Sequence, residues 1–244
     1  MDSLSPLPAT GSPPRTTAAV ASVVHTVSLL LILAGWSAWG YWGARHARAG
    51  QDPHRAATYI LTSSWEWAVV GYIAWGVRKQ GRSLGELVGQ RWTSFGSFLA
   101  DWGISIAFWI VAIVILKITA LLLHMTGNLE KMRFLFPQTP LESFLWIVTS
   151  VTAGICEEII FRGYFQRQFL AWTCNVPAAV LLSAAAFGGG HIYQGGKAAI
   201  VITVYGILFG VLAHFRKNLF PGMIAHAWHD GFTGFVVRLL PKSS

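Results

Sequence analysis

Carboxylate and imidazole side chains gather in three short stretches in the second half of the chain. Together with one arginine they form a set of candidate residues for chemistry: Glu157, Glu158, Arg162, His191, His226 and Asp230. These side chains can act as general acids and bases, stabilise an oxyanion or bind a metal ion. Each lies in or beside a strongly apolar segment, where an ionisable group costs roughly 2.5–3.5 kcal/mol on insertion scales. Each is therefore a candidate functional residue.

The two adjacent glutamates are predicted to have different roles. Consecutive residues of an α-helix point about 100° apart, so Glu157 and Glu158 face different directions. Arg162 follows Glu158 by four residues, in the order that favours an ion pair on one helix face. Glu157 is then free to act as a general base. The alternative is a purely structural Glu158–Arg162 pair, with Glu157 facing a polar loop.

The histidines have structural interpretations as well as functional ones. His191 follows Phe187 by four residues and three glycines, so it shares a helix face with Phe187 or ends the helix at the membrane interface. His226 and Asp230 share one helix face, where they can bind a metal, orient an imidazole, bind an oxyanion or link two helices. Three polar patches on helices otherwise almost free of charge favour one shared, water-filled cavity.

The elements that must position these residues are apolar enough to lie in a membrane. Of 244 residues, 54 % are hydrophobic and 11 % are charged, whereas a soluble domain carries roughly 25 % charged residues. This composition excludes a disordered chain, a disulfide-rich secreted module and an ordinary soluble enzyme. The net charge of +8 comes from basic residues between the apolar runs, which indicates lipid head-group contacts and no nucleic-acid partner.

Seven apolar segments are each expected to form a membrane-spanning helix, with six to eight as the range. They are 18–42, 59–77, 98–123, 144–169, 176–193, 198–215 and 220–240. The predicted fold is an all-α, polytopic integral membrane helix bundle of about seven transmembrane helices. A flexible tail (1–17) precedes N-terminal transmembrane helices (18–140) and a catalytic core (141–244) within a single membrane domain. Glu66, in the second segment, is expected to be a satisfied polar group of the bundle and not a catalytic residue.

Three motifs occur in order on these segments. EEIIFR (157–162), FGGGH (187–191) and HAWHD (226–230) match the patterns EExxxR, FxxxH and HxxxN/D. In these motifs, over about residues 141–240, the chain resembles the CAAX-protease and bacteriocin-processing (CPBP or ABI) family of glutamic-type intramembrane proteases. The resemblance implies that Glu157 and His191 activate the attacking water. It also implies supporting roles for Glu158, Arg162 and Phe187.

The resemblance further implies that His226 and Asp230 stabilise an oxyanion or complete a polar or metal site. The family has Asn as well as Asp at the last motif position, and an ionised Asp cannot donate a hydrogen bond. Asp230 therefore favours orienting His226 or binding a metal. Glu157, His191, His226 and Asp230 are acceptable Zn²⁺ ligands. A zinc metalloprotease and a metal-free site both stay open.

The expected function is an intramembrane endopeptidase like a CAAX prenyl protease, in a multi-pass protein of the bacterial cell membrane. Its substrates would be membrane proteins, lipidated (CAAX-like) proteins or hydrophobic peptides in the lipid bilayer. A proton-coupled transporter would place the same acids and histidines in a relay through several helices. A non-catalytic peptide-binding membrane protein is the other alternative.

Overall fold

The computed structural model describes residues 18–46, 54–89, 92–125 and 135–239. In this part of the chain the regular structure is helical, apart from one isolated bridge between Gly89 and Asn218. The helices are α1 (Val23–His46), α2 (Arg55–Arg78), α3 (Leu84–Val88), α4 (Phe95–Leu122), α6 (Pro140–Glu157), η3 (Glu158–Phe165), α7 (Gln166–Thr173), α8 (Val176–Gly190), η4 (Ile192–Gln194), α9 (Gly196–Arg216) and α10 (Phe220–Leu239). The predicted all-α membrane bundle is confirmed.

All seven segments expected to span the membrane are helical, with ends shifted by a few residues. Within the described residues, four helical stretches are both long and apolar enough to cross a membrane, namely α1, α4, the continuous α6–η3–α7 and α9. The helix α8 is apolar but has only 15 residues. An integral membrane protein is therefore supported, while seven spans stay a prediction. The expected flexible tail, 1–17, lies outside the described residues.

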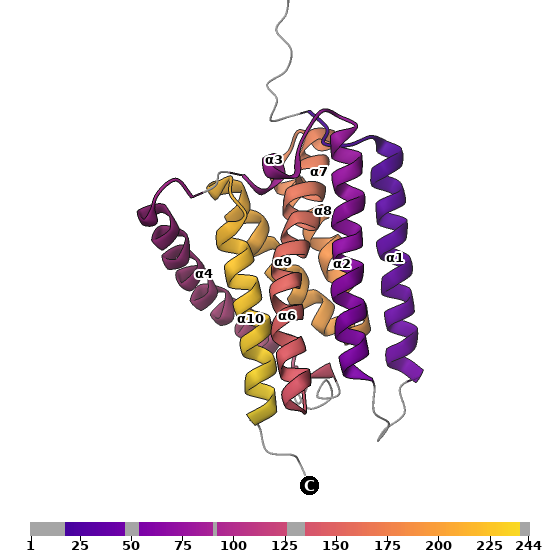
Figure 1. Ribbon diagram of the computed structural model, residues 1–244, viewed down its shortest axis with the longest axis vertical. Coiled ribbons are helices and arrows are strands. Elements are labelled where there is room, and N and C mark those ends of the chain that lie inside the picture. The colour runs from indigo at the N-terminus through magenta and orange to yellow at the C-terminus, as the bar shows by residue number, and fades with distance from the viewer. Residues whose placement is uncertain (1–17, 47–53, 90–91, 126–134, 240–244) are drawn as a thin grey trace, which may run out of the picture.

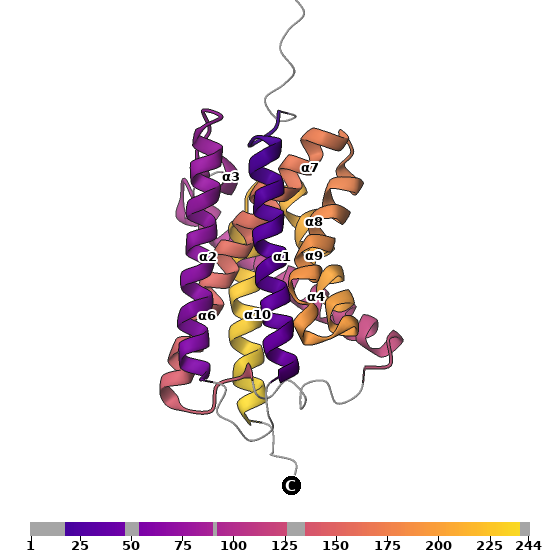
Figure 2. The same ribbon diagram turned by 90° about the vertical axis from the view of Figure 1, so that its right-hand side faces the viewer.

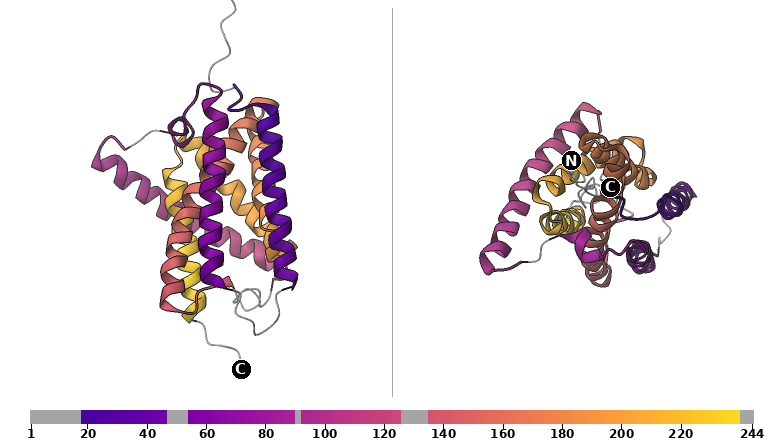
Figure 3. Two further views of the ribbon diagram at one scale, coloured as in Figure 1. Left: turned by 45° about the vertical axis from the view of Figure 1, so that its right-hand side comes forward. Right: turned by 90° about the horizontal axis from the view of Figure 1, so that it is seen from above.

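The long helices pack around the central segment η3. Figures 1 and 2 show α1 and α2 running alongside each other, and Figure 3 shows α4 inclined on the opposite side of the molecule. The helix α6 packs against α2 and α10, and α8 packs against α9. The outer face of α4 is apolar, and only 11 % of the residues in its most apolar stretch are buried. This is expected for a helix that faces lipid.

The central stretch departs from the expected regular α-helix. Residues Glu158–Phe165 form a π-helix of eight residues between α6 and α7, and all eight are buried. A π-helix bonds each N–H to the carbonyl five residues earlier, so it redirects the side chains that follow, and such stretches are frequent at functional sites. The side chains of this stretch form much of the hydrophobic core together with residues of α1 and α2.

Two close helix contacts depend on glycine. A Cβ atom at Gly154 of α6 would lie 2.7 Å from the backbone nitrogen of Ala227 in α10. A Cβ atom at Gly206 of α9 would lie 3.1 Å from the Cα atom of Ala184 in α8. Without side chains at these positions the helix backbones approach closely. These contacts bring α8 and α10, which carry the histidine motifs, against the helices that surround η3.

Candidate active site

The three polar motifs meet at the junction between α6 and η3. Glu157 is the last residue of α6, His191 follows the end of α8, and His226 lies in α10. The Oε1 atom of Glu157 lies 3.9 Å from Nε2 of His191, and its Oε2 atom lies 3.5 Å from Nε2 of His226. The structure therefore brings together residues that are far apart in the sequence, from α6, the end of α8 and α10.

The distances around Glu157 leave room for a reactant. Both are longer than a direct hydrogen bond, and gaps of this length between polar groups are commonly bridged by water. The side chains of Glu157 and His191 are 16 % and 19 % exposed, and both line a cavity. A water molecule in this gap would contact a carboxylate oxygen and an imidazole nitrogen at once.

The local structure of α8 sets the orientation of His191. The helix ends at Gly190, so His191 does not continue it. The Nδ1 atom lies 2.8 Å from the carbonyl oxygen of Phe187. A carbonyl can only accept, so Nδ1 carries the hydrogen and Nε2 of the neutral ring presents its lone pair toward Glu157. The ring of Phe187 packs edge-on against His191, with ring centroids 4.9 Å apart.

The second glutamate forms the buried side of the site. The Oε1 atom of Glu158 accepts a hydrogen bond of 2.9 Å from Nη1 of Arg162, and both side chains are 1 % exposed. This is the ion pair that the spacing predicts. The other guanidinium nitrogen of Arg162 donates to the carbonyl of Gly206 in α9 at 3.2 Å. The ring of Phe187 lies 4.5 Å from the guanidinium carbon, so Arg162 links η3 to α8 and α9.

His226 joins the buried Glu158–Arg162 pair to the partly buried Glu157. Its Nδ1 atom lies 3.1 Å from Oε1 of Glu158. Its Nε2 atom faces Glu157 and also lies 3.6 Å from Oδ2 of Asp230. The ring stacks on Phe209 of α9, with ring centroids 5.1 Å apart. The orientation of this imidazole is therefore fixed from two sides.

Asp230 is the most exposed member of the cluster. Its side chain is 33 % exposed and contacts His226 one helical turn earlier. Its backbone carbonyl accepts a hydrogen bond of 2.9 Å from the indole nitrogen of Trp146 in α6. The backbone of Asp230 thus helps to hold α10 against α6. The side-chain carboxylate of Asp230 is directed toward His226.

A cavity of about 770 Å³ extends from Glu157 and His191 toward α1 and α2. Sequence reasoning did not place Trp36 or Trp65 at this cavity, and it assigned Glu66 to the bundle and not to the site. The rings of Trp36 in α1 and Trp65 in α2 stack with centroids 4.6 Å apart. An acidic residue in an apolar segment was the available signal for Glu66.

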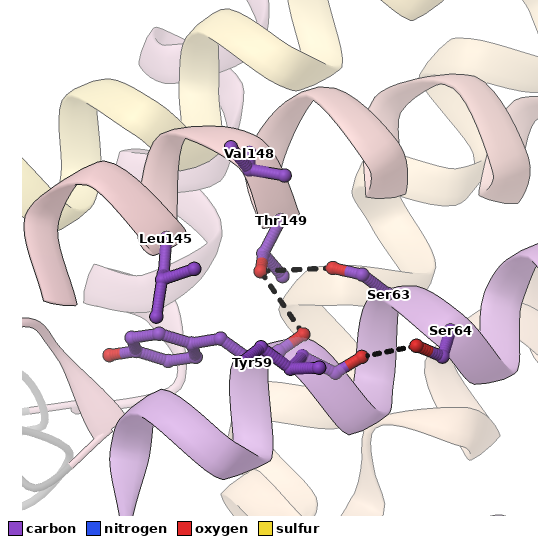
Figure 4. A pocket seen from close by; sticks show the side chains of 7 residues that line it. Tyr59, Ser63, Ser64, Leu145, Val148 and Thr149 are labelled. Atoms are coloured by element: carbon purple, nitrogen blue, oxygen red, sulfur yellow. Dashed lines mark hydrogen bonds between the residues drawn. The ribbon is translucent and has the colours of Figure 1, made fainter. Parts of the chain in front are cut away.

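A second, smaller cavity of about 170 Å³ lies between α2 and α6 (Figure 4). Its polar side chains bond one another or the nearby backbone: Ser63 and Thr149 are 3.1 Å apart, and Ser64 donates to the carbonyl of Ile60. In the part of the chain that the structure describes, no acid and no histidine lines this cavity. It is therefore separate from the candidate active site.

The donor atoms do not form a metal centre. Among the residues that the structure describes, no group of three or more His, Cys, Asp and Glu side chains could hold a metal ion. The zinc metalloprotease that the sequence left open is therefore not supported by the ligand geometry.

Comparison with known proteins gives one family. Residues 139–232 match the Rce1-like family, described as type II CAAX prenyl endopeptidase Rce1-like. No curated protein and no solved structure matches the chain. The matched segment begins at Thr139, which caps the N-terminus of α6, and contains all three motifs. Over this segment the chain is similar to the Rce1-like family, which supports its assignment to the CAAX-protease and bacteriocin-processing family of intramembrane proteases.

Proposed function

We propose that the protein is an endopeptidase that hydrolyses a peptide bond at membrane depth, with water activated by Glu157 and His191. The observation that carries the proposal is the 3.9 Å gap between Oε1 of Glu157 and the free Nε2 of His191. Both atoms belong to side chains that line the large cavity. Carboxylate and imidazole groups within reach of one water are suited to general-base catalysis.

The reaction begins with removal of a proton from water. Glu157 accepts the proton while His191 holds the water by its Nε2 lone pair. The resulting hydroxide oxygen forms a bond to the carbonyl carbon of the substrate. The π electron pair of the C=O bond moves to the carbonyl oxygen. The C–N bond then breaks, and Glu157 returns its proton to the departing amine. The products are a carboxylic acid and an amine.

His226 stabilises the negative oxygen in this proposal. Glu158 holds its Nδ1 atom at 3.1 Å, so a protonated ring directs Nε2–H toward the cluster. A donor aimed at a developing oxyanion contributes most where water is excluded, and His226 is buried. Asp230, at 3.6 Å from Nε2, orients the ring. Glu158, Arg162 and Phe187 are positioning residues.

The substrates are membrane-associated proteins, lipidated proteins of the CAAX type or hydrophobic peptides. The apolar outer surface of α4 and the apolar walls of the large cavity support substrates that are already in the bilayer. No step of this reaction is routed through a metal, because the described residues contain no set of ligands for one.

The test is cleavage by the purified protein in liposomes. Wild type and Glu157→Gln are incubated with a mixture of prenylated and hydrophobic peptides, and the products are identified by mass spectrometry. We expect fragments from wild type and a loss of at least about 100-fold in Glu157→Gln, the usual contribution of a general base. The matched control is Glu86→Gln, an exposed capping-box acid of α3, which should cleave normally.

Two outcomes would contradict the proposal. One is a set of fragments that persists in Glu157→Gln. The other is an absence of fragments from wild type that thermal unfolding shows to be folded. The second result would favour a peptide-binding protein or a proton-coupled transporter, which proton-flux measurements on the same variants would separate.

A further inference from the structure

Glu66 differs from every other buried acid among the described residues. Glu158 pairs with Arg162, Asp101 pairs with Arg216, and Glu142 pairs with Arg55. Glu66 is 7 % exposed, and its Oε2 atom is buried without a hydrogen-bond partner in the described part of the chain. The expectation that this side chain is a satisfied polar group is therefore wrong. A buried polar atom with no partner is costly, so it calls for an explanation.

Glu66 faces the same cavity as Glu157 and His191. Among the described residues, no lysine or arginine lines the cavity, whereas Glu66 and Glu157 both do. The space in front of the reacting groups is thus bordered by the acids Glu66 and Glu157, with the imidazole of His191 facing Glu157. A cation brought in by a ligand would find an unpaired carboxylate in a medium of low dielectric constant.

The wall beside Glu66 suits the stem of such a cation. Trp65 precedes Glu66 in α2 and stacks on Trp36 of α1, and both indoles line the cavity. Lysine and arginine carry long apolar stems that pack on aromatic surfaces, while their charged ends bind carboxylates or the faces of aromatic rings. The same cavity is therefore lined by an apolar wall, Trp36 and Trp65, and by the acidic side chain of Glu66.

We propose that Glu66 is a specificity-determining residue that binds a lysine or arginine side chain of the peptide in the cavity. The inference rests on the proposed function, because the peptide must lie in this cavity for Glu157 to reach its scissile bond. The charged end of the substrate side chain donates to the carboxylate of Glu66, which gives a charge-assisted hydrogen bond. A peptide with an apolar side chain at that position leaves the carboxylate of Glu66 without a partner, so it binds with lower affinity.

The first experiment measures binding and does not require hydrolysis. A set of fluorescent hydrophobic peptides, each with one lysine at a different position, is compared with a set carrying norleucine at the same positions. Binding to Glu157→Gln in detergent micelles is followed by anisotropy. We expect one lysine position to bind about tenfold more tightly than its norleucine counterpart, the usual effect of one hydrogen bond to a charged group.

Replacement of the Glu66 carboxylate by an amide should remove that preference. In Glu66→Gln/Glu157→Gln the lysine and norleucine peptides should bind equally, and norleucine binding should be unchanged. The matched control is Ser63→Ala/Glu157→Gln, because Ser63 lies on α2 and lines the other cavity. Thermal unfolding shows whether each variant is folded. If Glu66→Gln is not folded, Glu66→Leu is used in its place.

The inference is overturned if no lysine peptide binds more tightly than its norleucine counterpart. It is also overturned if the preference persists without Glu66, or if none of the basic peptides binds. These results are independent of turnover, since Glu157→Gln is used throughout. Failure of the proposed function would instead be seen as missing fragments with wild type.

Discussion

The Nδ1 atom of His226 lies 3.1 Å from the same oxygen of Glu158 that accepts a hydrogen bond from Arg162. One buried carboxylate oxygen thus links the arginine of the first motif to the histidine of the third. This link leaves Nε2 of His226 directed toward Glu157 and Asp230. Glu158 therefore acts on the candidate reaction through the orientation of His226.

Substitution of Arg162 by methionine should strongly destabilise the protein. It leaves Glu158 buried without its basic partner, and breaking a buried ion pair costs about 3–5 kcal/mol in free energy of unfolding. The measurement is denaturant unfolding in detergent micelles, and Arg45→Met on the exposed end of α1 is the control. In Glu158→Gln/Arg162→Met part of the stability should return. Equal stability of Arg162→Met and Arg45→Met would contradict the buried pair.

Local spacing in the sequence was sufficient for part of the site. The four-residue interval between Glu158 and Arg162 predicts their ion pair, because residues at this interval share a helix face. The cost of charge in lipid predicts that Glu157, His191 and His226 meet. Both relations follow from single residues and a general property of helices or membranes, so no knowledge of the tertiary fold was needed.

Other parts of the site depend on packing between distant segments. The hydrogen bond from His226 to Glu158 requires α10 to cross α6 at one register, which periodicity alone does not define. The π-helix over Glu158–Phe165 has no pattern of its own in a single apolar sequence. The position of Glu66 on the same cavity as Glu157 follows from the way α2 packs on α6 and η3. These features became visible only in three dimensions.

Alanine at Gly154 should impair catalysis as well as stability. Its Cβ atom would lie 2.7 Å from the backbone carbonyl of Met223 and from the backbone nitrogen of Ala227. Backbone atoms cannot rotate away, so α6 and α10 must separate and His226, between those two residues, must move from Glu157. We expect a loss of about 1–3 kcal/mol in free energy of unfolding, with peptide cleavage reduced further.

The control for this substitution is Gly71→Ala. Gly71 lies inside α2 with nothing within 4 Å of an added Cβ atom, so alanine should stabilise that helix by about 0.5–1 kcal/mol. Unfolding and peptide cleavage are measured for both variants. Full cleavage by Gly154→Ala would show that the contact between α6 and α10 does not position His226.

Asparagine at position 230 should preserve most of the activity, whereas alanine should not. The side-chain oxygen of Asp230 lies 3.6 Å from Nε2 of His226, and the amide oxygen of asparagine can accept from the same nitrogen. Alanine has no acceptor, so His226 loses one of its two orienting contacts. We expect kcat/KM of Asp230→Asn within about tenfold of wild type, and a loss of about 100-fold in Asp230→Ala. An inactive Asp230→Asn would show that the negative charge itself is required.

Peptide cleavage should continue after divalent metals are removed. The described residues contain no group of three or more potential ligands arranged for a metal ion. The oxygen of Glu157 and the nitrogen of His191 instead face each other across a gap suited to water. The enzyme is dialysed against EDTA and 1,10-phenanthroline, its metal content is measured by mass spectrometry, and cleavage is compared before and after. A zinc peptidase, whose metal-bound water is its nucleophile, serves as the control and should lose activity under the same treatment. Loss of cleavage that Zn²⁺ restores would show that a metal takes part and that these donor atoms rearrange to bind it.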